Sequence, residues 1–252
     1  MVGLSAVSRP FATVLDVSVG SNGTDATLTF VLFLGMALLA TLGIRFSYYA
    51  VQNSRRTRID AQSRIWQRLQ YIGAFGAGYA GLWLVEIVTG IGLRGKNALW
   101  LAMTLALVLS LRQISTTAGR ALDDSMAALD RLVRLGFLAV VAVYLVAAVV
   151  LGENALTAVI EGLAGVGFLA YGVYFFRRQV ASTRLQGTML DSLVRHLLPV
   201  LTFASVFSIA GLAVAGGIDR TVVLHVQLVF LIMTATTMMT ATIKLRQNLA
   251  GL

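Results

Sequence analysis

Long apolar stretches alternate with short polar segments along most of this chain. A helix needs about 20 apolar residues to cross a bilayer. Seven stretches reach or nearly reach that length, and they cover residues 27–51, 69–93, 97–117, 134–152, 155–176, 196–216 and 221–243. The pattern therefore predicts an all-α fold, with one bundle of seven transmembrane helices over residues 26–252 and a polar, extracytoplasmic tail at residues 1–25.

Composition supports the membrane interpretation. Hydrophobic residues make up 58% of the chain and charged residues 12%, whereas a soluble domain has about 25% charged residues. There is no cysteine, which excludes disulfides and thiolate metal sites. We expect a multi-pass protein of the cell membrane, with lipid as the solvent for most of the chain.

Basic residues are distributed unevenly between the two ends of the predicted spans. Segments 52–68, 112–134 and 177–195, with the tail after residue 243, hold fifteen lysines and arginines, and the opposite ends hold four. Because cytoplasmic loops carry the basic excess, we predict that the N-terminus is outside and the C-terminus inside. Contact with an anionic leaflet then accounts for the net charge of +9 without nucleic acid.

The three basic loops share an aspartate with an arginine four residues later. The pairs are Asp60 with Arg64, Asp130 with Arg134, and Asp191 with Arg195. On a helix this spacing allows a modest ion pair. The repetition favours a bundle of repeated helical hairpins, and chance similarity among apolar helices is the alternative.

Apolar residues at helical spacing, such as Leu129 and Val133, predict that these loops are themselves helical. A cytoplasmic protein partner would dock on them, or they would lie as amphipathic helices on the leaflet.

Arg45 and Arg112 fall near the inner ends of the first and third spans. The apolar run 98–111 is too short to cross alone, so Arg112 must lie near or inside the inner membrane boundary. Snorkelling to the lipid headgroups accounts for both arginines, and a charge that holds helices together or gates a path is the alternative.

Ionisable residues inside three spans form the main candidate site. Counting 1.5 Å per residue, Glu86 lies roughly 10 Å from the outer end of its span, Glu161 roughly 9 Å and His225 roughly 6 to 8 Å. Tyr144 lies near the same depth, as does Gln227, which points off the His225 face. If these groups are adjacent, they would bind a cation, a proton or a cationic ligand. Alternatively, each acid is satisfied separately by a neighbouring helix.

The second span is rich in small residues. Ala74 and Gly78, and likewise Ala77 and Gly81, are spaced four residues apart. This spacing lets a neighbouring helix approach closely.

No enzyme motif is present. The chain has no nucleophile elbow, zinc-protease motif or phosphate-binding loop, and His196 and His225 fall at opposite membrane faces. We therefore expect no enzyme, metal or cofactor. Seven spans with this orientation match the topology of seven-helix receptors and retinal proteins, but the middle of the last span has no lysine to bind retinal.

Two functions remain. The first is a sensory or signal-coupling module, with an outer pocket at Glu86, Glu161, His225 and Tyr144 and with cytoplasmic coupling through Arg45, Arg112, Asp130, Arg134, Asp191 and Arg195. The second is a proton- or cation-coupled transporter or channel that uses Glu86 and Glu161. A structural subunit of a larger complex, or a homo-oligomer, is a further alternative.

Overall fold

The computed structural model describes residues 26–57, 60–118, 124–180 and 189–250. The polar tail at 1–25 lies outside these residues. The helices are α1 (Ala26–Arg56), α2 (Asp60–Thr89), α3 (Asn97–Ala118), α4 (Asp124–Leu151), α5 (Ala155–Val180), α6 (Met189–Ala210), α7 (Leu212–Ala215) and α8 (Arg220–Ala250). Within the described residues, seven of them are long and apolar enough to span a membrane. The prediction of an all-α bundle of seven transmembrane helices is confirmed.

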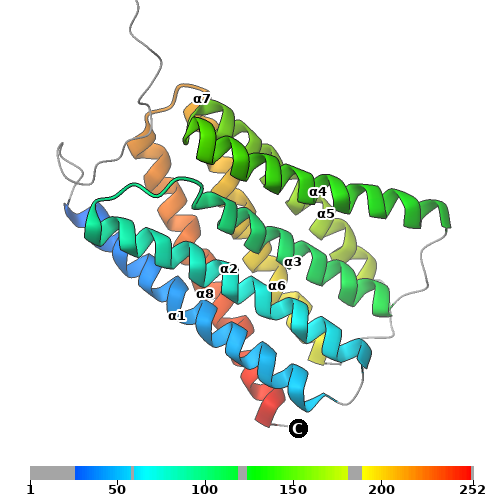
Figure 1. Cartoon of the computed structure of the whole chain (residues 1–252). Helices are drawn as coiled ribbons and strands as arrows, with labels where there is room; N and C mark the ends of the chain where they lie inside the picture. The colour runs from blue at the N-terminus through cyan, green and yellow to red at the C-terminus, as the bar shows by residue number, and fades with distance from the viewer. Residues whose placement is uncertain (1–25, 58–59, 119–123, 181–188, 251–252) are drawn as a thin grey trace, which may run out of the picture.

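The two ends of the bundle differ in their connections. Segments 90–96, 152–154 and 216–219 join helices at one end, which we call the short-loop end. Glycines with positive φ, among them Gly90 and Gly152, allow the chain to turn there. The chain enters α1 at the short-loop end and leaves α8 at the opposite end, which we call the long-loop end (Figure 1).

Several helices continue past the apolar stretches that predict them. At the long-loop end α2 begins at Asp60 and α4 at Asp124, about nine or ten residues before the predicted spans. Most of the predicted polar loops therefore belong to the transmembrane helices themselves, and in the described residues they are not separate surface helices. At the short-loop end α2 stops at Thr89, where Gly90 follows with φ of 71°.

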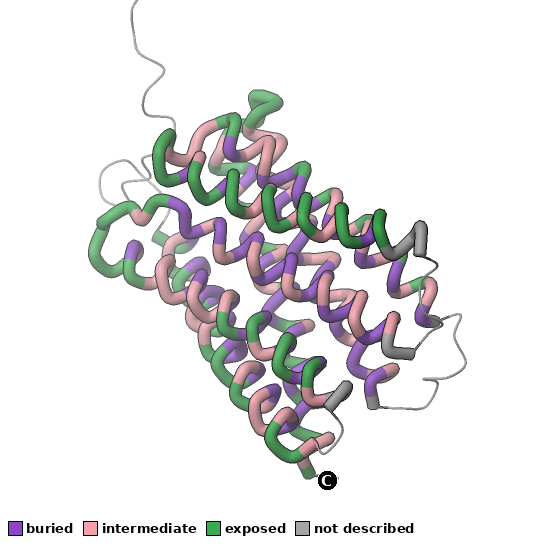
Figure 2. The backbone as a smooth tube through the Cα atoms, turned by 45° about the vertical axis from the view of Figure 1, so that its right-hand side comes forward, coloured by how far each residue is buried: buried purple, intermediate pink, exposed green. Residues whose placement is uncertain are grey.

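Six of the spanning helices form an arc, and the seventh, α3, lies inside it. Around the outside, α1 contacts α2 and α8, α8 contacts α6, α6 contacts α5, and α5 contacts α4. The central helix α3 contacts α2, α4, α5 and α6 (Figure 1). In the most apolar 18-residue stretch of α3, 67% of the residues are buried, whereas in that of α4 only 11% are buried (Figure 2). Helix α4 is thus the least embedded spanning helix, and few apolar contacts hold it.

Small residues bring α1 and α2 close together. A Cβ added to Gly43 would lie 2.7 Å from the Gly73 carbonyl oxygen and 2.8 Å from the Ala77 amide nitrogen. The predicted close approach of a neighbouring helix therefore occurs at Ala77, where α1 packs against α2. It does not occur at Gly81, because a Cβ added there would have no neighbour within 4 Å. Gly78 instead faces α3 through Leu99.

Candidate functional site

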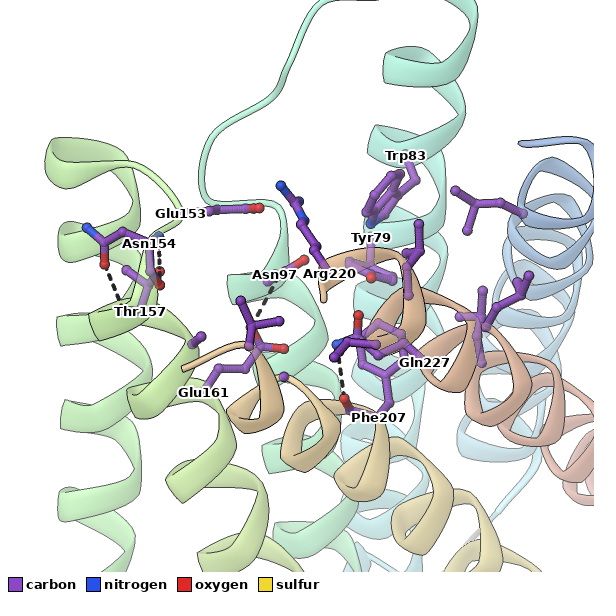
Figure 3. Close-up of a pocket in the computed structure, with 18 of the residues that line it drawn as sticks. Tyr79, Trp83, Asn97, Glu153, Asn154, Thr157, Glu161, Phe207, Arg220 and Gln227 are labelled. Atoms are coloured by element: carbon purple, nitrogen blue, oxygen red, sulfur yellow. Dashed lines mark hydrogen bonds between the residues drawn. The ribbon is translucent and has the colours of Figure 1, made fainter. Parts of the chain in front are cut away.

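A cavity of about 160 Å³ opens inside the bundle near its short-loop end. This is room for several water molecules or one small polar molecule. Figure 3 shows that polar side chains from several helices converge on it. Its polar and aromatic lining includes Tyr79, Trp83, Asn97, Tyr144, Glu153, Asn154, Thr157, Glu161, Phe207, Arg220 and Gln227. We call this cavity the pocket.

Local capping fixes the backbone on two sides of the pocket. At the start of α5, the side-chain oxygen of Asn154 accepts a hydrogen bond from the backbone amide of Thr157 at 3.1 Å. The backbone amide of Asn154 donates to the Thr157 hydroxyl at 2.8 Å. At the start of α8, the Asp219 carboxylate accepts from the Thr221 amide at 2.8 Å. Such caps satisfy free amides in the first turn, and here they define where Glu161 and Arg220 lie.

Glu161 joins three helices in the pocket. Its side chain is buried, and its Oε2 accepts hydrogen bonds from Asn97 Nδ2 of α3 at 3.2 Å and from the Tyr144 hydroxyl of α4 at 3.3 Å. Glu161 and Tyr144, both predicted from their depth, are therefore in contact. Asn97 was not predicted, because it begins a helix and its sequence position resembles a loop.

The other two predicted members lie elsewhere. Glu86 is buried outside the pocket lining, where its Oε2 accepts from Lys96 Nζ at 2.6 Å and from the Leu93 amide at 3.1 Å. His225 is exposed, and its Nδ1 lies 2.6 Å from the Thr221 carbonyl oxygen on the same helix. The expected grouping of Glu86, Glu161 and His225 is therefore corrected: similar depth did not place these residues on facing sides of their helices.

Gln227 takes the place expected for His225. It lines the pocket, and its Nε2 donates to the Phe207 carbonyl of α6 at 3.2 Å. Val223 and Leu231, four residues before and after Gln227, are buried on the same face of α8. His225 is two residues from Gln227, so the two side chains project from different faces of the helix.

Five buried polar atoms around the pocket make no hydrogen bond of normal geometry with the described residues, although Tyr79 lies near Trp83 and Glu161 near Ser208. They are Glu161 Oε1, Asn97 Oδ1, Tyr79 Oη, Trp83 Nε1 and Glu153 Oε1, and all five residues line the pocket. Buried polar groups are normally hydrogen-bonded, because leaving them unpaired is costly. Such convergence around one cavity is typical of a site that takes a polar occupant.

Charges at the mouth of the pocket are close together. Lys96 Nζ lies 3.7 Å from the centre of the Trp83 ring while it pairs with Glu86. Glu153, in the connection between α4 and α5, interacts electrostatically with Lys96 and Arg220. Burial raises the pKa of Glu153, and these two positive charges oppose the rise.

An apolar layer closes the pocket on the side facing the long-loop end. Trp100 lies one turn beyond Asn97, packs against Tyr79 and Phe207 with ring centres 4.9 Å and 4.5 Å apart, and donates to the Ala204 carbonyl at 3.1 Å. Fully buried apolar side chains continue beyond it, among them Met103, Leu107, Val108, Leu111 and Leu201. Buried hydroxyl groups also lie within the bundle, among them those of Thr104, Ser205 and Thr234, but the described residues place no buried charged side chain between this layer and Arg112.

A second polar cluster lies at the long-loop end. Asp130 of α4 accepts from Arg112 of α3 through both carboxylate oxygens, with the Nε contact at 2.6 Å. Its oxygens also contact the Tyr171 hydroxyl of α5 and, at 3.3 Å, Arg134 Nε. We call these four residues the paired cluster. Arg112 thus holds helices together, the alternative that the sequence left open, and Tyr171 was not predicted.

The remaining predicted coupling residues are peripheral. Arg195 Nε lies 3.2 Å from Asp191 with 54% of the arginine side chain exposed. Arg45 is exposed on α1. The expected spacing thus gives an ion pair for Asp130 with Arg134 and for Asp191 with Arg195, and the Asp60 side chain lies outside the described part of the structure.

Comparison of the chain with protein-family models, with curated proteins and with solved structures yields no match.

Proposed function

We propose that the protein is a sensory or signal-coupling module of the cell membrane, in which the pocket binds a small polar ligand. Five polar atoms without a well-formed hydrogen bond around one cavity support this proposal most directly. A ligand that supplied hydrogen bonds to these atoms would bind favourably, because a buried polar atom without a partner is costly.

The two polar clusters supply a route for coupling. Glu161, Asn97 and Tyr144 connect α5, α3 and α4 at the pocket, and Asp130, Arg112 and Tyr171 connect the same three helices at the long-loop end. A ligand that repositions Glu161 would shift these helices relative to one another, and rigid helices carry such shifts along their length. A partner at the long-loop end would respond to the shift.

Orientation belongs to the same proposal. The basic excess on the segments of the long-loop end supports an orientation with that end in the cytoplasm and the pocket on the outer side. The protein would then sense a ligand of the extracytoplasmic space and present helix ends to a cytoplasmic protein. The proposal includes no catalytic step.

A proton- or cation-coupled transporter is the second candidate. The free Oε1 of buried Glu161 favours it, because an unpaired acid inside a membrane span is costly unless it is used. The apolar layer beneath the pocket and the direct pairing of Glu86 with Lys96 argue against it.

Two measurements on the same protein separate the candidates. In proteoliposomes, the sensor proposal predicts no flux of protons, sodium or potassium above that of protein-free vesicles. In hydrogen–deuterium exchange, Glu161→Gln should alter protection of the amides around Asp130, roughly 20 Å along α4 from Tyr144. Flux that is abolished by Glu161→Gln would establish transport instead, and unchanged exchange around Asp130 would contradict coupling.

A further inference from the structure

The balance of charge around the pocket is uneven. Three acids, Glu86, Glu153 and Glu161, lie in or beside it with two bases, Lys96 and Arg220. Lys96 contacts Glu86 directly at 2.6 Å. Arg220 interacts electrostatically with Glu153 and then with Glu86. Two of the three acids thus have a nearby base, and the described residues provide no ion pair for Glu161.

The unpartnered atoms are mainly acceptors. Glu161 Oε1, Asn97 Oδ1 and Glu153 Oε1 can only accept if the acids are ionised, whereas Trp83 Nε1 can only donate and Tyr79 Oη can do either. A complementary occupant therefore carries several donors at one end and a single acceptor at the other. An ammonium group has three donors and one positive charge.

Size and wall chemistry restrict the occupant further. A cavity of about 160 Å³ admits only a few heavy atoms. Its walls include the Tyr79 and Phe207 rings and the apolar side chains of Leu32 and Leu228. Only one end of a larger molecule would fit within this volume, and an anionic group inside it would add to the excess of acids.

From these observations, and on the basis of the proposed ligand site, we propose that the pocket binds a small primary ammonium compound, with its charge against Glu161 and a hydroxyl or similar acceptor toward Trp83 and Tyr79. The ammonium group can belong to a free amine or to a lipid headgroup, because both present the same donors. Binding gives Glu161 Oε1 a donor and brings a positive charge beside its carboxyl group, which favours the ionised carboxylate.

The test uses three probes of nearly equal size on the detergent-solubilised full chain at pH 7. They are ethanolammonium, neutral ethylene glycol and anionic glycolate, each titrated at constant ionic strength while the unfolding temperature is followed. Ethanolammonium should raise the unfolding temperature saturably, because a ligand of the folded state stabilises it by mass action. The other two probes should produce no saturable shift.

Glu161→Gln should weaken ethanolammonium binding at least tenfold, and Glu153→Gln by a smaller factor. Asp191→Asn, which removes an acid of the long-loop end, is the matched control and should retain the affinity of the unmodified chain. Circular dichroism and size-exclusion elution establish that each variant is folded. Competition by nanodiscs of phosphatidylethanolamine, but not phosphatidylcholine, would identify a lipid as the source, and its absence would indicate a free amine.

Preference for ethylene glycol or glycolate, or full affinity in both acid variants, overturns the ammonium assignment. Saturable binding of ethylene glycol alone would still leave the pocket as a ligand site, so the proposed sensory function would survive that outcome. Failure of the proposed function appears separately, in the ion flux and the hydrogen exchange around Asp130.

Discussion

The pocket and the paired cluster connect the same three helices, but they differ in how fully the carboxylate at their centre is hydrogen-bonded. That carboxylate is Glu161 in the pocket and Asp130 in the paired cluster. Both oxygens of Asp130 are bonded, to Arg112 and Arg134 and to the Tyr171 hydroxyl. Glu161 uses one oxygen for two long hydrogen bonds and leaves the other without a described partner. A buried acid with every lone pair satisfied holds structure together, whereas one left partly unsatisfied is suited to binding.

This difference matters most for α4. Only 11% of its most apolar window is buried, so packing alone fixes it weakly. Asp130 and Tyr144, separated by roughly 20 Å along the helix, are its polar attachments to α3 and α5. A strong attachment at one end and a weak one at the other would let α4 pivot at the pocket while it stays anchored at Asp130.

The largest effect should follow from breaking the anchor. Arg112→Gln removes the two bonds from α3 and leaves Asp130 buried with less positive charge around it, which should cost roughly 3 kcal/mol of unfolding free energy. Unfolding in mixed micelles measures this loss. Arg195→Gln is the control: its ion pair is exposed, so we expect a loss below about 0.5 kcal/mol. Equal losses in the two variants would contradict an anchoring role for Arg112.

A tyrosine-to-phenylalanine change at each cluster should sharpen the comparison. Tyr171→Phe deletes a hydrogen bond to a charged acceptor and should cost about 1.5 to 3 kcal/mol. Tyr144→Phe deletes a 3.3 Å bond to Glu161, and should cost less than about 1 kcal/mol. Unfolding free energies of the two variants, compared under the same conditions, test the order. The reverse order would mean that the pocket, and not the paired cluster, holds α4.

The smallest effect concerns pH. The pKa of Glu153 is raised above its ordinary value of 4.5, chiefly by burial. The folded state then binds a proton more tightly than the unfolded state, so this group lowers stability as the pH rises through and above 4.5. Glu153→Gln should therefore be slightly more stable than the unmodified chain at pH 8, and the difference should vanish near pH 4. A difference of the opposite sign at pH 8 would mean that Lys96 and Arg220 outweigh burial.

The sequence predicts the helices well because crossing a bilayer requires long apolar runs, and these are visible without any tertiary information. The sequence predicts poorly which face of each helix points into the bundle. In lipid, outward and inward faces are both apolar, so periodicity does not identify the inner face as it does in soluble helices. His225 shows the consequence: its depth was suitable, but it lies on the exposed side of α8.

Pocket residues at the ends of the spans were also not predicted from the sequence. Asn97, Glu153 and Arg220 flank short connections and resemble ordinary loop residues in the sequence, yet all three line the pocket. The connections bring them inward because so few residues join the helices there. By contrast, Arg112 was singled out from the sequence because its apolar run is too short to cross alone, and Asp130 because its loop repeats the spacing of an aspartate and an arginine. Their pairing with each other was not predicted.

One measurement tests the contrast between the two clusters most directly: the unfolding free energies of Asp130→Asn and Glu161→Gln, compared with that of the unmodified chain in the same micelles. Each change replaces an acid by its amide. We predict a loss of about 3 kcal/mol for Asp130→Asn, because Arg112 is left buried without a full counter-charge. For Glu161→Gln we predict a change within about 1 kcal/mol, since one oxygen still serves Asn97 and Tyr144. Equal losses, or a larger loss for Glu161→Gln, would contradict the division into an anchoring cluster and a binding pocket.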